Sequence, residues 1–272
     1  MMILTVNPDT CKTTILKAIL FAFEYFGITD FQLSAPTGKA ARRMAEATGR
    51  TTQTIHKMLG LGSSEEATTF SHLNPLPAEV VSVDEMSMVD ISLFAKLVSS
   101  LQRSARLIMI GDYDQLASVG PGRVLQDLLD SGLPSIRLTQ PQRQAAQSKI
   151  IQAAHSINRG EVPQLAAFGS SEDVWASYAA TEEQGKAALL KVFGHLQAAR
   201  IDLSRIRVLS PMKQGGVGVF SLNSMLQEIV NPPNPLLKEI AWLGGVLREG
   251  DSLIQLKNNY EIDLMNGEEV KL

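Results

Sequence analysis

The stretch VVSVDEMS, from Val80 to Ser87, decides the fold of this chain. Three valines around one serine predict a short strand buried on both faces. Two carboxylates, Asp84 and Glu85, follow at once. Ligands of parallel sheets bind at the carboxyl ends of the strands. Asp84 is therefore expected to hold Mg²⁺, directly or through water, and Glu85 to orient and deprotonate an attacking water. Taken alone, the dipeptide also fits an exposed turn.

Strands and helices alternate around this stretch. Strands are expected at Ile3–Val6, Phe31–Ala35, Val80–Val83, Leu107–Ile110 and Ile136–Leu138. Helices are expected at Lys12–Phe26, Gly38–Ala47, Ile91–Leu101 and Val124–Leu129. This order predicts an α/β fold with a mostly parallel sheet and helices on both faces.

A second unit is expected after a helix near Ile150–Asn158. It would contain helices at Gln184–Gln197 and Ser221–Ile229 and strands at Arg207–Leu209, Ile240–Trp242, Ser252–Leu256 and Glu269–Leu272. Pro232, Pro233 and Pro235 form a break, because proline fixes φ and removes a donor.

The run Val6-Asn7-Pro8-Asp9-Thr10-Cys11-Lys12-Thr13-Thr14 joins the first strand to the first helix. A strand, a short loop and Lys-Thr opening a helix are the layout of a phosphate-binding loop, in which lysine meets the phosphates and threonine holds Mg²⁺. Lys12 and Thr13 are in place. The glycines that let the backbone wrap the phosphates are not, since Val6 and Cys11 stand where the first and last belong.

The missing glycines weaken the prediction of a phosphate site. A residue other than glycine costs roughly 1–3 kcal/mol in a glycine-only backbone geometry. Asp9 adds a carboxylate beside a polyanion, a repulsion of about 4 kcal/mol at ~4 Å and an effective dielectric near ~20. Together these effects lower the affinity by roughly 10³ or more. Taken alone, the segment fits an ordinary strand–helix turn.

Another strand ends in Gly111-Asp112-Tyr113-Asp114-Gln115-Leu116, followed by Ser118-Val119-Gly120-Pro121-Gly122. Gln115, at a strand terminus beside the acidic pair, is a candidate sensor of a γ-phosphate. The glycines would let the loop approach a ligand closely. A glycine-rich surface loop is the alternative.

Composition limits the remaining choices. The 272 residues carry a net charge of −3, one cysteine and four histidines, which offer no zinc arrangement. One cysteine fits a reducing cytoplasm, and no segment predicts a membrane span. A local basic patch (Lys39, Arg42, Arg43, Arg50 and Lys57 against Glu46) predicts weak, salt-sensitive contact with a nucleic-acid backbone. A solvated helix face is the alternative.

Several ordered motifs resemble the RecD-like branch of superfamily 1 DNA helicases, which includes the exodeoxyribonuclease V alpha subunit. Ala35–Arg43, Val83–Met88 and Gly111–Leu116 look like its motifs Ia, II and III. Further similar segments are Thr54–Leu59, Ser118–Gly122, Gln142–Gln144, Ile157–Gly160, Leu209–Lys213, Lys257–Tyr260 and Asn266–Gly267. The similarity runs nearly end to end.

The resemblance implies ATP-driven movement along single-stranded or partially duplex DNA, typically 5′ to 3′, on two RecA-like domains of the P-loop NTPase class. It implies ATP and Mg²⁺ as cofactors, no membrane, and subunits of a helicase–nuclease complex as partners. It assigns catalysis to Asp84, Glu85, Gln115 and Arg143, with Arg143 as an arginine finger. Nucleotide binding falls to Pro8, Thr10, Cys11, Lys12, Thr13 and Thr14, and the metal to Thr13 and Asp84. DNA contacts fall to Pro36, Thr37, Lys39, Arg42, Thr54, His56 and Lys57.

The resemblance also sets the expected domains. Residues 1–148 would form the first motor domain, with a hairpin insertion at about 60–77. Residues 149–272 would form an incomplete second one, with a small β insertion from about 248. The missing glycines, and the lack of later Thr-x-His-x-x-Gln-Gly and Thr-Arg-Ala segments, predict an impaired helicase. The alternative is an inactive pseudo-helicase or fragment that keeps weak single-stranded DNA binding.

Overall fold

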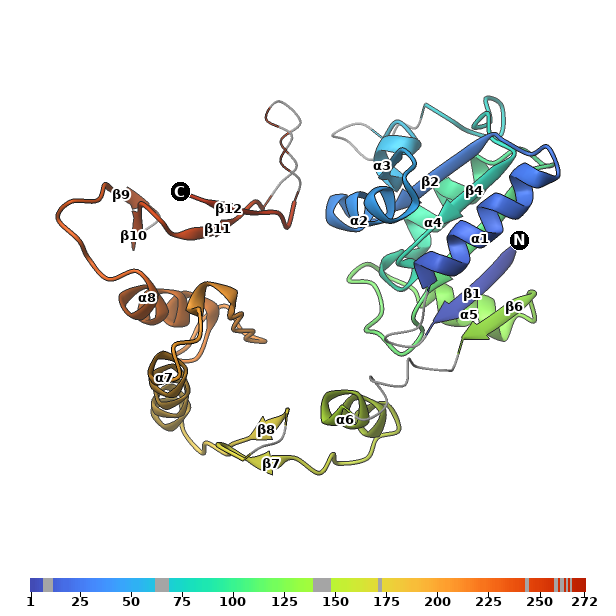
Figure 1. Cartoon of the computed structure of the whole chain (residues 1–272). Helices are drawn as coiled ribbons and strands as arrows, with labels where there is room; N and C mark the ends of the chain where they lie inside the picture. Colours follow the sequence, from blue (N-terminus) through green and yellow to red (C-terminus); the bar gives the residue numbers. More distant parts are fainter. Residues whose placement is uncertain are drawn as a thin grey trace. The chain divides into compact units, whose positions relative to one another are not determined.

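The computed structural model describes residues 1–6, 12–61, 69–138, 148–170, 173–242, 245–256, 259, 262, 264 and 266–272. The chain divides into two compact units, the first formed mainly by Met1–Pro163 and the second mainly by Gln164–Leu256 (Figure 1). The expected domain limits at 148/149 and 248 stay predictions. Within the described ranges, no helix has both the length and the apolar character needed to cross a bilayer.

The first unit contains a six-stranded sheet in the order β3-β2-β4-β5-β1-β6. All five neighbouring pairs are parallel, which confirms the expected α/β class. The strands are β1 (Met2–Val6), β2 (Phe31–Ala35), β3 (Thr52–Thr54), β4 (Val80–Val83), β5 (Arg106–Gly111) and β6 (Ser135–Leu138). Only β3, an edge strand of three polar residues, was not expected.

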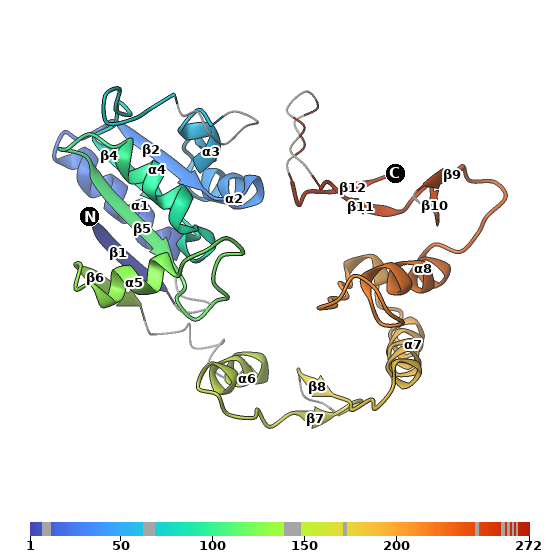
Figure 2. The same cartoon turned by 180° about the vertical axis from the view of Figure 1, so that it is seen from behind.

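Helices cover both faces of this sheet. They are α1 (Lys12–Tyr25), α2 (Gly38–Thr48), α3 (Ile55–Met58), the 3-10 turn η1 (Met86–Met88), α4 (Ile91–Ser99) and α5 (Val124–Asp130). Helices α1 and α2 pack on one face, with α1 in front of the strands in Figure 1. The other face carries α3, η1, α4 and α5; α4 and α5 come to the front in Figure 2.

Successive residues of the central strands feed opposite cores because strand side chains alternate between faces. In β4, Val80 belongs to the core under α1 and α2, and Val81 to the core under α4 and α5. All four residues of β4 are buried, as expected from its sequence. Because β4 is buried on both faces, its carboxyl end is held firmly in the sheet. The acidic pair begins at this end.

The rest of the chain carries shorter elements. They are α6 (Lys149–Asn158), β7 (Ala166–Ala167), β8 (Trp175–Ala176), α7 (Glu182–Ala198), the 3-10 turn η3 (Leu203–Arg205), α8 (Val219–Val230), β9 (Glu239–Trp242), β10 (Gly245–Arg248), β11 (Ser252–Ile254) and β12 (Glu269–Lys271). The strands pair in twos, as β7 with β8, β9 with β10 and β11 with β12. Their assignment to an incomplete second motor domain stays a prediction.

The prediction of a strand at Arg207–Leu209 is wrong. These residues have no regular structure, and Leu209 is almost fully exposed. A strand needs a neighbour for its backbone groups, and this segment pairs with none in the described part of the chain. Arg207 instead donates to the backbone carbonyls of Ser204 and Ile206 and pairs with Glu269.

Candidate functional site

The acidic pair lies at the carboxyl end of β4. The N–H of Asp84 donates to the carbonyl oxygen of Ser34 in β2 at 2.9 Å, which extends the sheet contact one residue beyond the strand. The Asp84 carboxylate in turn accepts the N–H of Glu85 at 2.8 Å. Glu85 adopts the left-handed conformation with φ of 54°. Such strain in a residue other than glycine persists only where neighbours hold it, and it is common at functional sites.

Lys12, the first residue of α1, meets both carboxylates. Its Nζ lies 2.7 Å from Glu85 Oε1 and 3.2 Å from Asp84 Oδ1. The three side chains are only partly exposed. The lysine at the helix start and the acidic pair after β4, 72 residues later in the chain, therefore form one charged cluster.

Burial and charge act against each other in this cluster. Burial raises the pKa of Asp84 above its ordinary value, although the Lys12 ammonium opposes it. Burial alone would lower the pKa of Lys12, but the carboxylates of Asp84 and Glu85 outweigh it and raise that pKa. Lys12 is thus held in its charged form, with the acidic pair as its counter-ions.

A cavity of about 380 Å³ opens beside this cluster, and we call it the Lys12 cavity. Its lining residues are Lys12, Leu16, Thr37, Lys39, Ala40, Arg43, Met44, Asp84, Glu85, Met88, Ile110 and Gln115. Ligand pockets in proteins commonly have volumes of roughly 300–1,000 Å³. The mixture of cations and carboxylates at the carboxyl edge of a parallel sheet suits a phosphate ligand with a divalent cation.

Gln115 enters the Lys12 cavity from the turn after β5. Its side-chain oxygen accepts from the hydroxyl of Ser87 at 3.5 Å. Asp112, in the same turn, is buried, and its carboxylate accepts the N–H of Asp114 at 3.0 Å. Burial raises the pKa of Asp112. Lys12, Asp84, Glu85 and Gln115 therefore line the same cavity.

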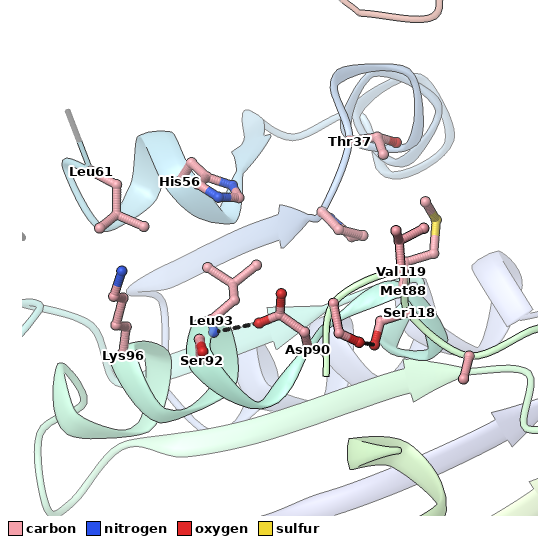
Figure 3. Close-up of a pocket in the computed structure, with 13 residues that line it drawn as sticks. Thr37, His56, Leu61, Met88, Asp90, Ser92, Leu93, Lys96, Ser118 and Val119 are labelled. Atoms are coloured by element: carbon pink, nitrogen blue, oxygen red, sulfur yellow. Dashed lines mark hydrogen bonds between the residues drawn. The ribbon is translucent and has the colours of Figure 1, made fainter. Parts of the chain in front are cut away.

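A second cavity of about 330 Å³, the His56 cavity, adjoins the first. It is lined by Pro36, Thr37, His56, Leu61, Met88, Asp90, Ser92, Leu93, Lys96, Ala117, Ser118, Val119 and Gly120. Figure 3 shows His56 and Thr37 across from Asp90 and Leu93, with the Asp90 carboxylate bonded to the N–H of Leu93 at 2.8 Å. Thr37 and Met88 line both cavities.

The residues expected to contact DNA are divided between these places. Pro36, Thr37 and His56 line the His56 cavity, whereas Lys39 lines the Lys12 cavity. Arg42 is exposed and pairs with Glu46 at 3.4 Å. Lys57 is also exposed, while Thr54 is buried and accepts the N–H of Lys57 as the cap of α3. Their DNA contacts stay predictions.

Some expected residues lie outside the described part of the chain. They are Pro8, Thr10, Cys11 and Arg143, together with the side chain of Thr13. Thr14 is exposed in α1. Within the described ranges, no cluster of three or more histidine, cysteine, aspartate or glutamate residues could hold a metal.

Sequence reasoning assigned no role to Ser87, Asp90 or Asp112, although each lies within or beside a quoted motif. Their position within five residues of Glu85 or Gln115 in the sequence was the available signal. The contacts that these residues make depend on how β4 and β5 meet. They are therefore a property of the fold.

Known families and proteins match this chain over most of its length. Residues 1–176 match a family model described as "AAA domain". Residues 222–269 match one described as "ATP-dependent RecD-like DNA helicase SH3 domain". The ATP-dependent RecD2 DNA helicase of Deinococcus radiodurans is 37% identical over 267 residues, covering 98% of this chain and 35% of that protein. The chain belongs to the RecD-like DNA helicase family.

A further relative and a solved structure are also similar to this chain. The RecBCD enzyme subunit RecD of Mycolicibacterium smegmatis is 28% identical over 302 residues, covering 98% of this chain and 53% of that protein. The chain thus spans about a third to a half of the length of these relatives. A solved structure, the Pif1 helicase from Candida albicans, aligns with a TM-score of 0.47 at 19% identity, covering 99% of this chain and 64% of that one. Membership in a family of AAA and P-loop helicases implies nucleotide binding.

Proposed function

We propose that this RecD-like chain binds ATP with Mg²⁺ in the Lys12 cavity and couples its hydrolysis to movement along single-stranded DNA. One observation carries the proposal, namely that Lys12, Asp84, Glu85 and Gln115 line one cavity at the carboxyl edge of a parallel sheet. Such an edge is where open α/β sheets bind ligands. The relatives include an ATP-dependent DNA helicase and a subunit of the RecBCD enzyme, and the DNA helicase supports the choice of DNA.

The donor set fits Mg²⁺. This ion prefers oxygen ligands and keeps several waters, so one or two carboxylates plus phosphate oxygens suffice. The Asp84 carboxylate lines the cavity and would hold the ion together with Thr13. Bound Mg²⁺ would neutralise phosphate charge beside the two carboxylates.

The Lys12–Glu85 ion pair gives the chain's own residues distinct tasks. An incoming triphosphate competes with the carboxylates for the Lys12 ammonium, because phosphate oxygens are also strong acceptors. When Lys12 turns to the phosphates, the Glu85 carboxylate loses its 2.7 Å partner and can accept a proton from water. Gln115 lines the same cavity, where its side-chain amide can donate to a terminal phosphate oxygen. Arg143 is proposed as the arginine finger.

We further propose that the activity is impaired. Val6 and Cys11 replace loop glycines, and Asp9 places a negative charge near the phosphates. These changes lower ATP affinity by roughly 10³ or more, as estimated from backbone strain and repulsion. A chain that binds single-stranded DNA without hydrolysing ATP is the second candidate, and this glycine-free run favours it. The 5′ to 3′ direction and partner subunits of a helicase–nuclease complex are parts of the proposal drawn from the resemblance.

The test is ATP hydrolysis with and without single-stranded DNA, measured beside a Glu85→Gln variant. DNA-stimulated turnover that disappears in Glu85→Gln supports the enzyme. DNA binding without turnover supports the second candidate. A triple variant (Val6→Gly, Asp9→Gly, Cys11→Gly) is expected to gain ATP affinity. If it neither binds nor hydrolyses ATP, the nucleotide site is wrong.

A further inference from the structure

The side chain of Gln115 is held at both ends of its amide. The oxygen accepts from the Ser87 hydroxyl at 3.5 Å, and the side chain also hydrogen-bonds the Asp112 carboxylate. An ionised carboxylate can only accept hydrogen bonds, so the amide nitrogen must be the group that faces Asp112. The oxygen is then the group that faces Ser87. The chemistry of the two neighbours fixes the orientation of the amide.

The two neighbours come from different parts of the sheet. Ser87 lies in η1 after β4, and Asp112 lies in the turn after β5. Gly111 lets these parts meet, because a Cβ there would lie 2.8 Å from Leu125 Cδ2 and 3.3 Å from the backbone nitrogen of Met86. Both Ser87 and Asp112 are buried, at 8% and 5% exposure. Neither is placed to touch a ligand directly.

Asp112 also shapes the backbone that carries Gln115. Its carboxylate accepts the N–H of Asp114 at 3.0 Å, and its carbonyl oxygen accepts the N–H of Gln115 at 3.3 Å. The turn and the side chain are therefore fixed by the same residue.

We propose that Ser87 and Asp112 are positioning residues that turn the amide nitrogen of Gln115 toward the terminal phosphate of a nucleoside triphosphate in the Lys12 cavity. The nitrogen carries two hydrogens, so one remains for a phosphate oxygen after the bond to Asp112. The inference rests on the proposed function, because it assumes that the cavity holds a triphosphate. It adds that Ser87 and Asp112 affect only the contact with the third phosphate, and that they do so only through Gln115.

This role separates binding of ATP from binding of ADP. Loss of the Ser87 hydroxyl would leave the Gln115 oxygen without its donor and let the amide turn away. The preference for ATP over ADP would fall by about threefold, the size expected for one neutral hydrogen bond. ADP lacks the third phosphate, so its affinity would stay the same.

The experiment titrates the full chain with fluorescent analogues of ATP and ADP in Mg²⁺. The variants are Ser87→Ala, Ser87→Thr, Gln115→Ala, the Ser87→Ala/Gln115→Ala double variant, and Ser131→Ala as a matched control. Ser131 is exposed at the end of α5, where its hydroxyl also donates to a backbone carbonyl. Each change is made both in the chain as it stands and in the triple-glycine variant, which ensures measurable affinity if the loop alone weakens binding.

Ser87→Ala should lower the ATP to ADP preference, and Ser87→Thr should restore it. The double variant should match Gln115→Ala alone, because Ser87 would act only through that residue. Ser131→Ala should change nothing. If ATP binds but Ser87→Ala weakens ATP and ADP equally, or adds fully to Gln115→Ala, the positioning role is wrong and the proposed function stands. If neither background binds ATP, both fall.

A second measurement does not depend on nucleotide. The two side-chain amide hydrogens of Gln115 give a pair of NMR signals whose positions depend on the groups that surround the amide. Ser87→Ala and Asp112→Asn should move that pair while other amide signals show that the chain is folded. Asparagine carries an amide nitrogen that donates in place of one carboxylate oxygen, so it offers Asp114 and Gln115 one acceptor oxygen where aspartate offers two. An unmoved pair in both variants would overturn the inference.

Discussion

Replacing Lys12 by methionine would remove the cation that two carboxylates share while keeping a side chain of similar length. In the unchanged chain, Lys12 Nζ lies 2.7 Å from Glu85 Oε1 and 3.2 Å from Asp84 Oδ1. At an effective dielectric of ~20, the gross attraction is about 5–6 kcal/mol for each pair. Desolvation offsets most of this attraction. Because the side chains are partly exposed, the net loss lies between the ~0–1 kcal/mol of a surface pair and the ~3–5 kcal/mol of a buried one. We expect about 2 kcal/mol.

The pH dependence of this loss follows from the two pKa shifts. Burial raises the pKa of Asp84 above its ordinary value of 3.8, with Lys12 in opposition. The folded chain then holds the Asp84 proton more tightly than the unfolded chain, so its ionisation destabilises the fold as the pH rises above 3.8. Without Lys12 this destabilisation grows. The deficit of Lys12→Met should therefore be largest near neutral pH and shrink as the pH falls through this window.

At alkaline pH the lysine itself sets the limit. Burial alone would lower the pKa of Lys12, but the two carboxylates raise it above its ordinary value of 10.5. The stability contributed by the charged lysine is complete below pH 10.5 and is lost only as the pH rises through the higher folded value. The difference between the parent and Lys12→Met should disappear there.

The assay is urea unfolding followed by circular dichroism at several pH values, with Lys17→Met as the control. Lys17 is exposed on the same helix. A loss of about 2 kcal/mol corresponds to a fall in Tm of roughly 4–8 °C for a unit of this size. Equal stability of the two methionine variants at neutral pH would refute the ion-pair cluster. A loss of stability in Lys12→Met that does not shrink at acidic pH would also refute it.

Three further predictions concern stability and DNA binding. Thr37→Ala should lower the free energy of unfolding by about 1 kcal/mol, because the hydroxyl caps α2, and Thr37→Ser should restore it in the same melts. Gly120→Ala should destabilise by about 1–3 kcal/mol, since its Cβ would lie 2.2 Å from the Asp90 carboxylate; Gly194→Ala, with open space in α7, should stabilise by up to ~1 kcal/mol in urea titrations. If Lys57 contacts a phosphate, Lys57→Gln should reduce the salt slope of single-stranded DNA affinity by about 0.7 in fluorescence anisotropy. An unchanged slope would remove Lys57 from the interface.

The central strands were predictable because their sequences satisfy a local requirement. Leu107–Ile110 is apolar without interruption and Val80–Val83 contains only one polar residue, Ser82, as suits a strand covered on both faces, and both segments are buried in the sheet. The edge strand Thr52–Thr54 carries no such signal. Its three polar residues become a strand because β2 offers a free edge, which is a property of the assembled sheet. Arg207–Leu209 shows the reverse case, in which a segment expected to be a strand has no neighbouring strand among the residues that the structure describes.

Some features of the candidate site could likewise be predicted from the sequence, and others could not. The order of strand ends along the chain predicts that Lys12, Asp84 and Gln115 meet, and the structure brings them to one cavity. Their roles stay predictions. The pairing of Lys12 with Glu85 rather than with a ligand, and the burial of Thr54 beneath its helix, depend on distances between residues far apart in sequence. Local patterns do not encode such distances.

The two residues shared by the cavities have a consequence for how ligands could affect each other. Thr37 and Met88 each present atoms to both sides. Occupants of the two cavities would contact the same two side chains. An unbranched thioether can adopt several rotamers at little energetic expense, so Met88 can yield to whichever neighbour is larger. A ligand that displaces Met88 in one cavity would therefore change the space available in the other.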